Sequence, residues 1–294
     1  MSVTSTYRGR FAPSPTGELH FGSLVAAVAS YADALHHRGE WLVRIEDLDP
    51  TREAKGATRR ILESLRAHGL EFPEPVLQSR RGELYQGALN ALLDSDHAYR
   101  CRCSRKQLAA TARRGRAGIV YPGTCRRETA PADAAAVRFR CAPGQIVSFA
   151  DQLQGSQSVA LDREIGDFLL RRGDRYFAYQ LAVAADDHAQ AISHVVRGTD
   201  LIDSTFMQLA VLDALGYQAP RYAHFPVVRG PDGRKLSKQS KAPPVDDKNN
   251  INNVFHALSY LNHQPPSELR NGPLDKLWAW VQQHWSLSRL CQIR

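Results

Sequence analysis

The chain passes from its first strand-like segment to its first helix through Arg10-Phe-Ala-Pro-Ser-Pro-Thr-Gly-Glu-Leu-His20-Phe-Gly22-Ser23. Residues 7–12 are short and β-compatible, and the Pro/Gly-rich run that follows ends the strand. From residue 20 to 37, apolar residues recur at spacings of three and four, which predicts a helix. The free N–H groups and the dipole at such a helix N-terminus favour phosphate. A Pro/Gly turn with an incidental histidine explains this stretch about equally well on its own.

The segments that follow continue the alternation of strands and helices. Residues 41–45 predict a buried strand and residues 51–68 an amphipathic helix. Further strands are expected at 137–140, 168–171, 192–197 and 225–229, and further helices at 204–215, 254–261 and 274–285. This alternation predicts an α/β fold, a Rossmann-type parallel sheet covered by helices. Ligands bind such sheets at the carboxyl ends of the strands.

The composition argues against a membrane-spanning chain and indicates a cellular location. No run approaches the ~20 apolar residues that a membrane span needs. The polar, basic start shows no export signal, so we expect a cytoplasmic protein. The net charge of +8 is compatible with a polyanionic partner but does not establish one.

Three of the five cysteines lie close together, at Cys101, Cys103 and Cys125. In a chain without an export signal this spacing favours a metal over disulfides. Three thiolates are one ligand short of a closed tetrahedral zinc site. Free cysteines remain the alternative. Cys141 lies in a strand-like segment, and we expect it to serve packing.

A second candidate motif, Gly233-Arg-Lys235-Leu-Ser-Lys238-Gln, lies in a late loop. Two lysines three residues apart could fold over a triphosphate and supply positive charge during reaction. A solvated basic loop is the commoner interpretation of such a pair when it stands alone.

Taken in order, the motifs are far more specific. The first stretch and the lysine loop resemble the two signatures of class I aminoacyl-tRNA synthetases. Arg44-Ile-Glu46-Asp47-Leu-Asp49 and His194-Val-Val-Arg197-Gly198-Thr-Asp200 narrow the resemblance to the glutamyl-tRNA synthetase family. It runs from about Arg10 to about Lys241. Three positions depart from the class signatures: Ser23 replaces a histidine, and Leu236 and Gln239 replace a methionine and a serine.

The resemblance implies roles for the motif residues. His20 and Lys238 would stabilise the transition state in which glutamate attacks the α-phosphate of ATP. Gly22 and Lys235 would complete the ATP site, with Mg²⁺ accompanying the nucleotide. The glutamate site would comprise Arg10, Ala12, Ser14, Glu46, Tyr179 and Arg197. The arginines suit a buried carboxylate, since a guanidinium pairs with it through two hydrogen bonds.

The resemblance also implies a fourth metal ligand, Tyr121, in the pattern Tyr-x-x-x-Cys125. The expected cofactor is one structural zinc ion per chain. Basic residues around the cysteines could face RNA or form a solvated surface: Arg102, Arg105, Lys106, Arg113, Arg114, Arg116, Arg126 and Arg127.

Four parts are expected along the chain. They are the first half of the catalytic domain at 1–99, a zinc-containing insertion at 100–185, the second half with the lysine loop at 186–242, and a short helical region at 243–294. Residues 243–294 are too few for the anticodon-binding domain of a full-length family member. This resembles members of the family that activate glutamate without tRNA and attach it to the queuosine base of tRNA(Asp). We expect a monomer with no membrane partner.

Three alternatives stay open. A truncated glutamyl-tRNA synthetase would charge ordinary tRNA(Glu). A nucleotide transferase of the same fold would not need the glutamate-binding set of residues. A non-catalytic RNA-binding paralogue would tolerate the loss of His20 or Lys238, and both are present.

Overall fold

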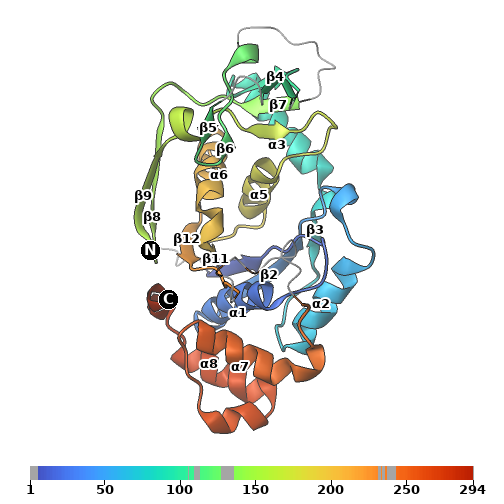
Figure 1. The fold of residues 1–294 in the computed structure, drawn as a ribbon, viewed down its shortest axis with the longest axis vertical. Coiled ribbons are helices and arrows are strands. Elements are labelled where there is room, and N and C mark those ends of the chain that lie inside the picture. Colours follow the sequence, from blue (N-terminus) through green and yellow to red (C-terminus); the bar gives the residue numbers. More distant parts are fainter. Residues whose placement is uncertain are drawn as a thin grey trace.

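Residues 6–104, 106–108, 113–126, 136–230, 233, 236 and 243–293 are described by a computed structural model of the chain. A twisted parallel sheet lies in the middle of the molecule (Figure 1). A lobe inserted between the two halves of this sheet lies at one end, and the C-terminal helices lie at the other. No helix of the described residues is long and apolar enough to cross a membrane.

The parallel sheet forms in two halves. Strands β1 (Arg8–Phe11), β2 (Glu40–Ile45) and β3 (Val76–Leu77) pair in parallel in that order. Strands β11 (His194–Gly198) and β12 (Arg221–Phe225) form the second parallel pair. The halves meet where the Ser193 N–H donates to the Arg8 carbonyl at 3.0 Å. The predicted parallel α/β architecture is therefore confirmed.

Helices cover the faces of this sheet, and the hydrophobic core lies between them and the strands. Helix α1 (Phe21–His36) packs on β1 and β11 and buries Leu24, Val25 and Val28 completely. Helices α5 (Tyr179–Ala189) and α6 (Ile202–Ala214) pack on each other between the sheet and the inserted lobe (Figure 1). Helix α2 (Ala57–Ala67) buries Ile61 and Leu65 in the core of the first half, whereas α3 (Gly82–Asp94) packs on α5 and β4.

The inserted lobe runs from β4 to β10 and is antiparallel. Strands β10 (Leu169–Arg171), β7 (Ala136–Phe139) and β4 (Ala98–Cys101) form its sheet, and β5 (Arg114–Gly115) pairs with β6 (Gly118–Ile119). The strands predicted at 137–140 and 168–171 exist, but they belong to this lobe and do not extend the parallel sheet.

A long hairpin returns from the lobe to the parallel sheet. Strands β8 (Ile146–Asp151) and β9 (Gly155–Ala160) pair along their full length, and the sequence patterns do not predict them. The end of β8 joins β12 in parallel, with Asp151 opposite Tyr222. The hairpin thus brings Asp151 to the second half of the catalytic sheet.

The C-terminal helices pack beneath α1. Helices α7 (Asn250–Tyr260) and α8 (Leu274–His284) contact α1, and Trp278 meets the edge of Tyr31 with ring centroids 4.8 Å apart. Trp285, which follows α8, donates from Nε1 to the buried Asp33 at 2.9 Å. Both predicted C-terminal helices are confirmed.

Two element boundaries differ from the sequence prediction. The helix expected at 51–68 begins only at Ala57, because Gly56 before it adopts a left-handed conformation with φ of 72°. The start of the expected segment, Pro50–Arg52, forms a short 3₁₀ helix instead. The strand expected at 225–229 is wrong: β12 ends at Phe225. Pro226 follows and has no N–H to continue the ladder. Helices α3 and α5 have no counterpart among the predicted segments.

Candidate active site and cysteine cluster

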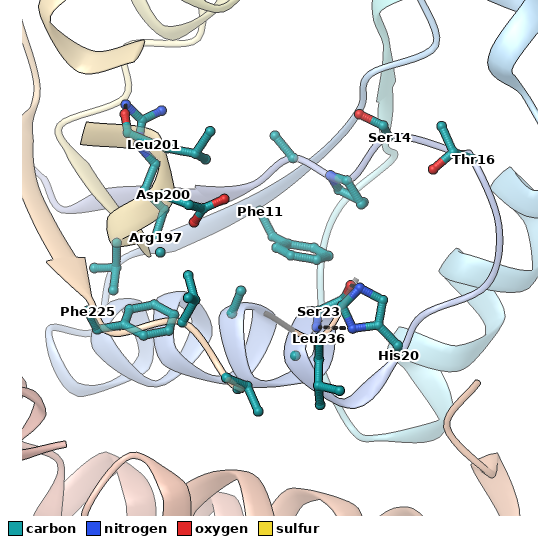
Figure 2. Close-up of a pocket in the computed structure, with 18 of the residues that line it drawn as sticks. Phe11, Ser14, Thr16, His20, Ser23, Arg197, Asp200, Leu201, Phe225 and Leu236 are labelled. Atoms are coloured by element: carbon teal, nitrogen blue, oxygen red, sulfur yellow. Dashed lines mark hydrogen bonds between the residues drawn. The ribbon is translucent and has the colours of Figure 1, made fainter. Parts of the chain in front are cut away.

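A pocket of about 620 Å³ opens at the carboxyl ends of β1 and β11. Figure 2 shows Arg197 on one side of it and His20 on the other, with Phe11 between them. Most predicted binding residues of the first and middle segments line this pocket, namely Arg10, Ala12, Ser14, His20, Gly22, Tyr179 and Arg197. The fold therefore brings together residues that lie far apart in the sequence.

Arg197 is a buried cation on β11, and hydrogen bonds from its Nε and Nη2 hold the guanidinium group in place. Nη2 donates to Thr205 Oγ1 at 2.7 Å and to Gln208 Oε1 at 2.9 Å, and Nε donates to His224 Nε2 at 3.1 Å. Nη1 is buried, and within the described part of the chain it has no hydrogen-bond partner. A buried donor without a partner calls for an acceptor from a ligand. Arg197 therefore suits an anionic group in the pocket.

Arg10 reaches the pocket from β1 and is held by an acidic residue of α5. Its Nη2 lies 3.2 Å from Asp187 Oδ2, and Arg44 reaches Asp187 Oδ1 at 2.7 Å. Burial opposes ionisation of Asp187, yet Arg10 and Arg44 hold the pKa of this carboxyl below its ordinary value. Arg44 also lies 3.5 Å from Asp186 Oδ2, so Arg10 shares Asp187 with an arginine that has a second acidic partner.

Glu46 lies directly after β2, at the same edge of the sheet. Its N–H donates to the Pro13 carbonyl at 3.0 Å, and Ser14 Oγ lies 3.4 Å from its Oε2. The residue keeps part of its surface accessible, but the protein atoms packed around its carboxyl raise the pKa to about 7. Arg44 and Arg10 oppose that rise. A cationic ligand group would favour the ionised form.

His20 caps the N-terminus of α1. Its Nδ1 accepts from the Ser23 N–H at 3.3 Å, and its Nε2 lies 3.0 Å from Ser23 Oγ (Figure 2). Ser23, where the class signature has a second histidine, therefore orients the first one. A Cβ at Gly22 would lie 3.2 Å from His20 Cε1, so only glycine leaves the imidazole undisturbed.

Tyr179 begins α5 on the same side of the pocket as Arg10. Burial raises the pKa of its phenol, and the charge of Glu46 adds to the rise, so the hydroxyl stays a donor at neutral pH. Lys235 and Lys238 lie outside the described residues. Leu236, between them, lines the pocket, and its N–H donates to the Val228 carbonyl at 2.9 Å.

The three predicted cysteines converge in the inserted lobe. Their Sγ atoms all lie within 4.8 Å of one another. The Tyr121 hydroxyl lies 3.5 Å from Cys101 Sγ and 3.4 Å from Cys103 Sγ. With Zn–S near 2.3 Å and Zn–O near 2.0 Å, tetrahedral geometry places sulfur and oxygen about 3.5 Å apart. The two distances from the Tyr121 oxygen match such a site, and the three cysteines could hold a metal ion.

A buried arginine supports this cluster from β7. The Arg138 guanidinium lies 4.1 Å from the centroid of the Tyr121 ring, and its Nε donates to Cys101 Sγ at 3.3 Å. Arg138 therefore places a buried positive charge and a hydrogen-bond donor beside the cluster. Cys141 is buried outside the cluster, and its Sγ donates to the Gly166 carbonyl at 3.2 Å, as expected for packing.

The basic residues around the cysteines do not form one uniform surface. Arg126 turns inward to Asp167, with Nε 2.6 Å from Oδ2, and Arg116 pairs with Asp203 of α6 at 2.5 Å. Arg114 is exposed. Arg105 and Arg127 lie outside the described residues. An RNA-facing role for this set stays a prediction, with Arg126 and Arg116 the members already engaged in ion pairs.

The sequence patterns miss the residues that hold the pocket arginines. Asp187, Thr205, Gln208 and His224 occur in unremarkable helical or strand contexts, and no motif includes them. Two charged residues side by side at 186–187 within an otherwise apolar helix segment are the one local hint. Their partners become apparent only when the strands and helices are assembled.

The chain belongs to the family of tRNA synthetases class I (E and Q), catalytic domain, which residues 6–254 match. It is 51% identical to a glutamyl-Q tRNA(Asp) synthetase of Chromobacterium violaceum over 286 residues, which is 97% of this chain and 95% of that protein. A protein of the same name from Dechloromonas aromatica is 47% identical, covering 97% of this chain and 95% of the relative.

Solved structures agree on the fold. A glutamate-tRNA synthetase from Elizabethkingia anophelis superposes with a TM-score of 0.81 at 23% identity, over 97% of this chain and 67% of that one. A glutamate tRNA ligase from Elizabethkingia meningosepticum, solved in complex with its amino acid, gives 0.80 at 23% identity over 97% of this chain and 66% of that one. At this identity the likeness shows the fold alone.

Proposed function

We propose that this chain is a ligase that activates L-glutamate with ATP, without tRNA, and transfers it to the queuosine base of tRNA(Asp). The observation that carries the glutamate specificity is the buried Arg197 guanidinium, whose Nη1 has no hydrogen-bond partner within the described part of the chain. The transfer to tRNA(Asp) is supported by relatives of nearly the same length whose name is glutamyl-Q tRNA(Asp) synthetase.

The charges around the pocket match the three charged groups of glutamate. Arg197 and Arg10 would hold the side-chain carboxylate, with Tyr179 adding a hydroxyl. Glu46 would accept the ammonium group, which a carboxylate with a pKa of about 7 can do once a cation is bound. Ser14 and the backbone at Ala12 would complete this site. The free α-carboxylate would then point toward the helix α1 end of the pocket.

The N-terminus of α1 would hold the phosphates of ATP. In the activation step an oxygen of the glutamate α-carboxylate attacks the α-phosphorus, and the bond to pyrophosphate breaks. His20, at the helix N-terminus beside Gly22, would donate to the charged phosphate oxygens. Lys235 and Lys238 would supply further positive charge, and Mg²⁺ would accompany the nucleotide.

The cysteine cluster would hold one structural zinc ion through Cys101, Cys103, Cys125 and Tyr121. The fit of the ligand distances to a tetrahedral site supports this assignment. Zinc would stabilise the insertion at 100–185. This insertion would separate the two catalytic halves at 1–99 and 186–242, and the helical region at 243–294 would follow the second half. A tRNA substrate and reduced thiolate ligands favour a cytoplasmic location.

The decisive experiment follows labelled glutamate in the presence of ATP. tRNA(Asp) is prepared with and without queuosine, and its acceptor end is blocked by periodate. We expect label only on the queuosine-containing tRNA, together with glutamate-dependent pyrophosphate exchange in the absence of tRNA. Label on the unblocked acceptor end of tRNA(Glu) would instead identify an ordinary glutamyl-tRNA synthetase activity. No exchange and no label would remove the enzymatic proposal.

A further inference from the structure

His224 lies in β12, fully buried between an acid and the pocket arginine. Its Nδ1 lies 2.5 Å from Asp151 Oδ2, and its Nε2 lies 3.1 Å from Arg197 Nε. Neither Asp151 nor His224 lines the pocket. A chain of contacts thus runs from the β8–β9 hairpin through β12 to the Arg197 side chain.

Arg197 decides which atoms donate and which accept in this series of contacts. The Nε–H of a guanidinium can only donate, so His224 Nε2 must accept from it. Thr205 Oγ1 also lies 3.1 Å from this nitrogen, and its hydroxyl donates to the Leu201 carbonyl. The imidazole proton must then be on Nδ1, where it donates to the Asp151 carboxylate. This assigns the tautomer from the hydrogen-bond network. Arg197 Nη2 is occupied by Thr205 and Gln208, so the acceptor on His224 fixes the remaining orientation of the guanidinium plane.

Backbone N–H groups of the β8–β9 turn and of β12 hold the Asp151 carboxylate in place. Its Oδ1 accepts from the N–H groups of Leu153, Gln154 and His224 at 2.9, 2.9 and 3.1 Å. These three donors occupy one carboxylate oxygen and leave Oδ2 for the imidazole. Burial and the positive charge of Arg197 keep His224 neutral, since they lower its pKa even against the opposing effect of Asp151.

We propose that Asp151 and His224 are positioning residues that fix the Arg197 guanidinium with Nη1 free for the carboxylate of the amino-acid substrate. The inference rests on the proposed function, because it names residues that prepare the glutamate site. It gives the β8–β9 hairpin a role in substrate affinity, although the hairpin does not touch the pocket.

The sharpest test is the substitution Asp151→Asn. The amide oxygen can keep the three N–H donors, so the NH₂ group then faces His224 Nδ1. That nitrogen must now accept, the imidazole proton moves to Nε2, and it opposes the Arg197 Nε–H. We expect the KM for glutamate in pyrophosphate exchange to rise roughly tenfold to a hundredfold, as for a lost hydrogen bond to a charged group. The KM for ATP and the rate at saturating glutamate should stay near wild type.

Two further variants separate positioning from general stability. His224→Gln offers an amide oxygen to Arg197 and should restore a lower glutamate KM than His224→Leu. Gln154→Ala is the matched control, because it removes a different tie between the hairpin and β12, the 2.8 Å bond from Gln154 Nε2 to the His224 carbonyl, and leaves the contacts among Asp151, His224 and Arg197 intact. An equal rise in glutamate KM for Gln154→Ala would overturn the proposal.

The tautomer can be read directly and does not depend on catalysis. The ¹⁵N shifts of the His224 imidazole should show the proton on Nδ1 in the wild type and on Nε2 in the Asp151→Asn variant. If the wild type exchanges pyrophosphate with glutamate but Asp151→Asn keeps the wild-type KM, the positioning role is wrong and the proposed function survives. If the wild type shows no glutamate-dependent exchange, the proposed function fails first and the glutamate role falls with it. Should Asp151→Asn fail to fold, the two His224 variants decide the question by the same KM comparison.

Discussion

The pocket and the cysteine cluster are assembled in opposite ways. Pocket residues are far apart in the sequence, from Arg10 on β1 to Arg197 on β11, and buried ion pairs and hydrogen bonds from other elements hold them. The metal-ligand candidates come from one short stretch, residues 101–125. They make up most of a small core of their own, in which Tyr99 and Leu108 are the other buried members among the described residues and Cys103 is partly buried.

This difference predicts different responses to damage. The pocket is held by the fold, so its geometry should persist without ligand, and a substitution there should cost affinity rather than structure. The strands of the lobe share a large core with α3 and α5, but the part around the cysteines has only a small apolar core, so the order of that part should depend on the metal. Loss of the metal should therefore disorder part of the lobe, whereas a substitution in the pocket should lower substrate affinity.

Metal removal should affect the lobe most. Structural zinc in small peptides contributes about 10–16 kcal/mol of apparent binding free energy. Chelation, or Cys103→Ser, should therefore abolish hydrogen-exchange protection between residues 113 and 126, including β5 and β6, and lower transfer to tRNA. Glutamate-dependent pyrophosphate exchange should persist, because the pocket lies elsewhere.

The exposed Cys291 offers the control for this prediction. Cys291→Ser should retain zinc and leave the lobe's exchange protection unchanged. Full protection of residues 113–126 in a metal-free protein would contradict the dependence of this part of the lobe on its metal.

Arg197→Leu should affect the pocket most. It would leave the substrate carboxylate buried without its cation, which costs about 3–5 kcal/mol when a buried pair is broken. In steady-state pyrophosphate exchange, kcat/KM for glutamate should fall by roughly a hundredfold to several thousandfold. Arg221→Leu, at the exposed start of β12, is the matched control and should leave kcat/KM unchanged. Retained glutamate activation in Arg197→Leu would refute the assignment of the carboxylate site.

Glu46 should set the acid limb of the pH profile. Its pKa is about 7, so the carboxyl loses its charge as the pH falls through that value and can no longer pair with the substrate ammonium. We expect kcat/KM for glutamate to fall in the same range, since this parameter reports the free enzyme. Glu46→Gln should abolish this pH dependence. It should also lower kcat/KM roughly 10- to 150-fold, which corresponds to about 1.5–3 kcal/mol of lost transition-state stabilisation.

The same pKa has a consequence for stability, with a definite sign. A carboxyl whose folded pKa lies above its ordinary 4.5 destabilises the fold progressively from that pH to about 7 and fully above it. Glu46→Gln should therefore be more stable than the wild type to denaturant above pH 7, and no more stable near pH 4. A variant that is less stable at high pH would show that Glu46 is not desolvated as the structure indicates.

Arg116→Ala should have the smallest effect. Arg116 joins the β5–β6 hairpin to Asp203 of α6 through a solvent-exposed ion pair. Such pairs contribute about 0.2–1 kcal/mol. Chemical denaturation should show a change within that range, with zinc content and glutamate activation unaltered. A loss several times larger would mean that this contact, and not the metal, organises the lobe.

Much of the fold was predictable because its pattern is local. Apolar spacing predicted α1, and a short apolar run predicted β2, and both are present. Boundaries failed where single residues overrode the pattern, at Gly56, whose backbone is left-handed, and at Pro226, which ends β12. The antiparallel pairing of the lobe was not predictable from strand patterns, because local alternation does not specify a partner strand.

The site was predictable only as a set of residue types. The motifs named Arg10, His20, Glu46 and Arg197, and the structure brings these to one edge of the sheet; their catalytic and binding roles stay predictions for the experiments above. The conclusions on Lys235 and Lys238 lie outside the described residues. The expectation of a monomer also stays a prediction.

By itself the sequence determined the chemistry that is available: two guanidinium groups, a carboxylate, a histidine at a helix start and three clustered thiols, in an order that defines the family. Only the tertiary structure decided which nitrogen of Arg197 lacks a partner among the described residues, and that His224 is a neutral acceptor between Asp151 and Arg197. The physical reason is that protonation and hydrogen-bond direction depend on neighbours from other strands and helices. Parallel strands and the returning β8–β9 hairpin bring those neighbours together across long stretches of chain.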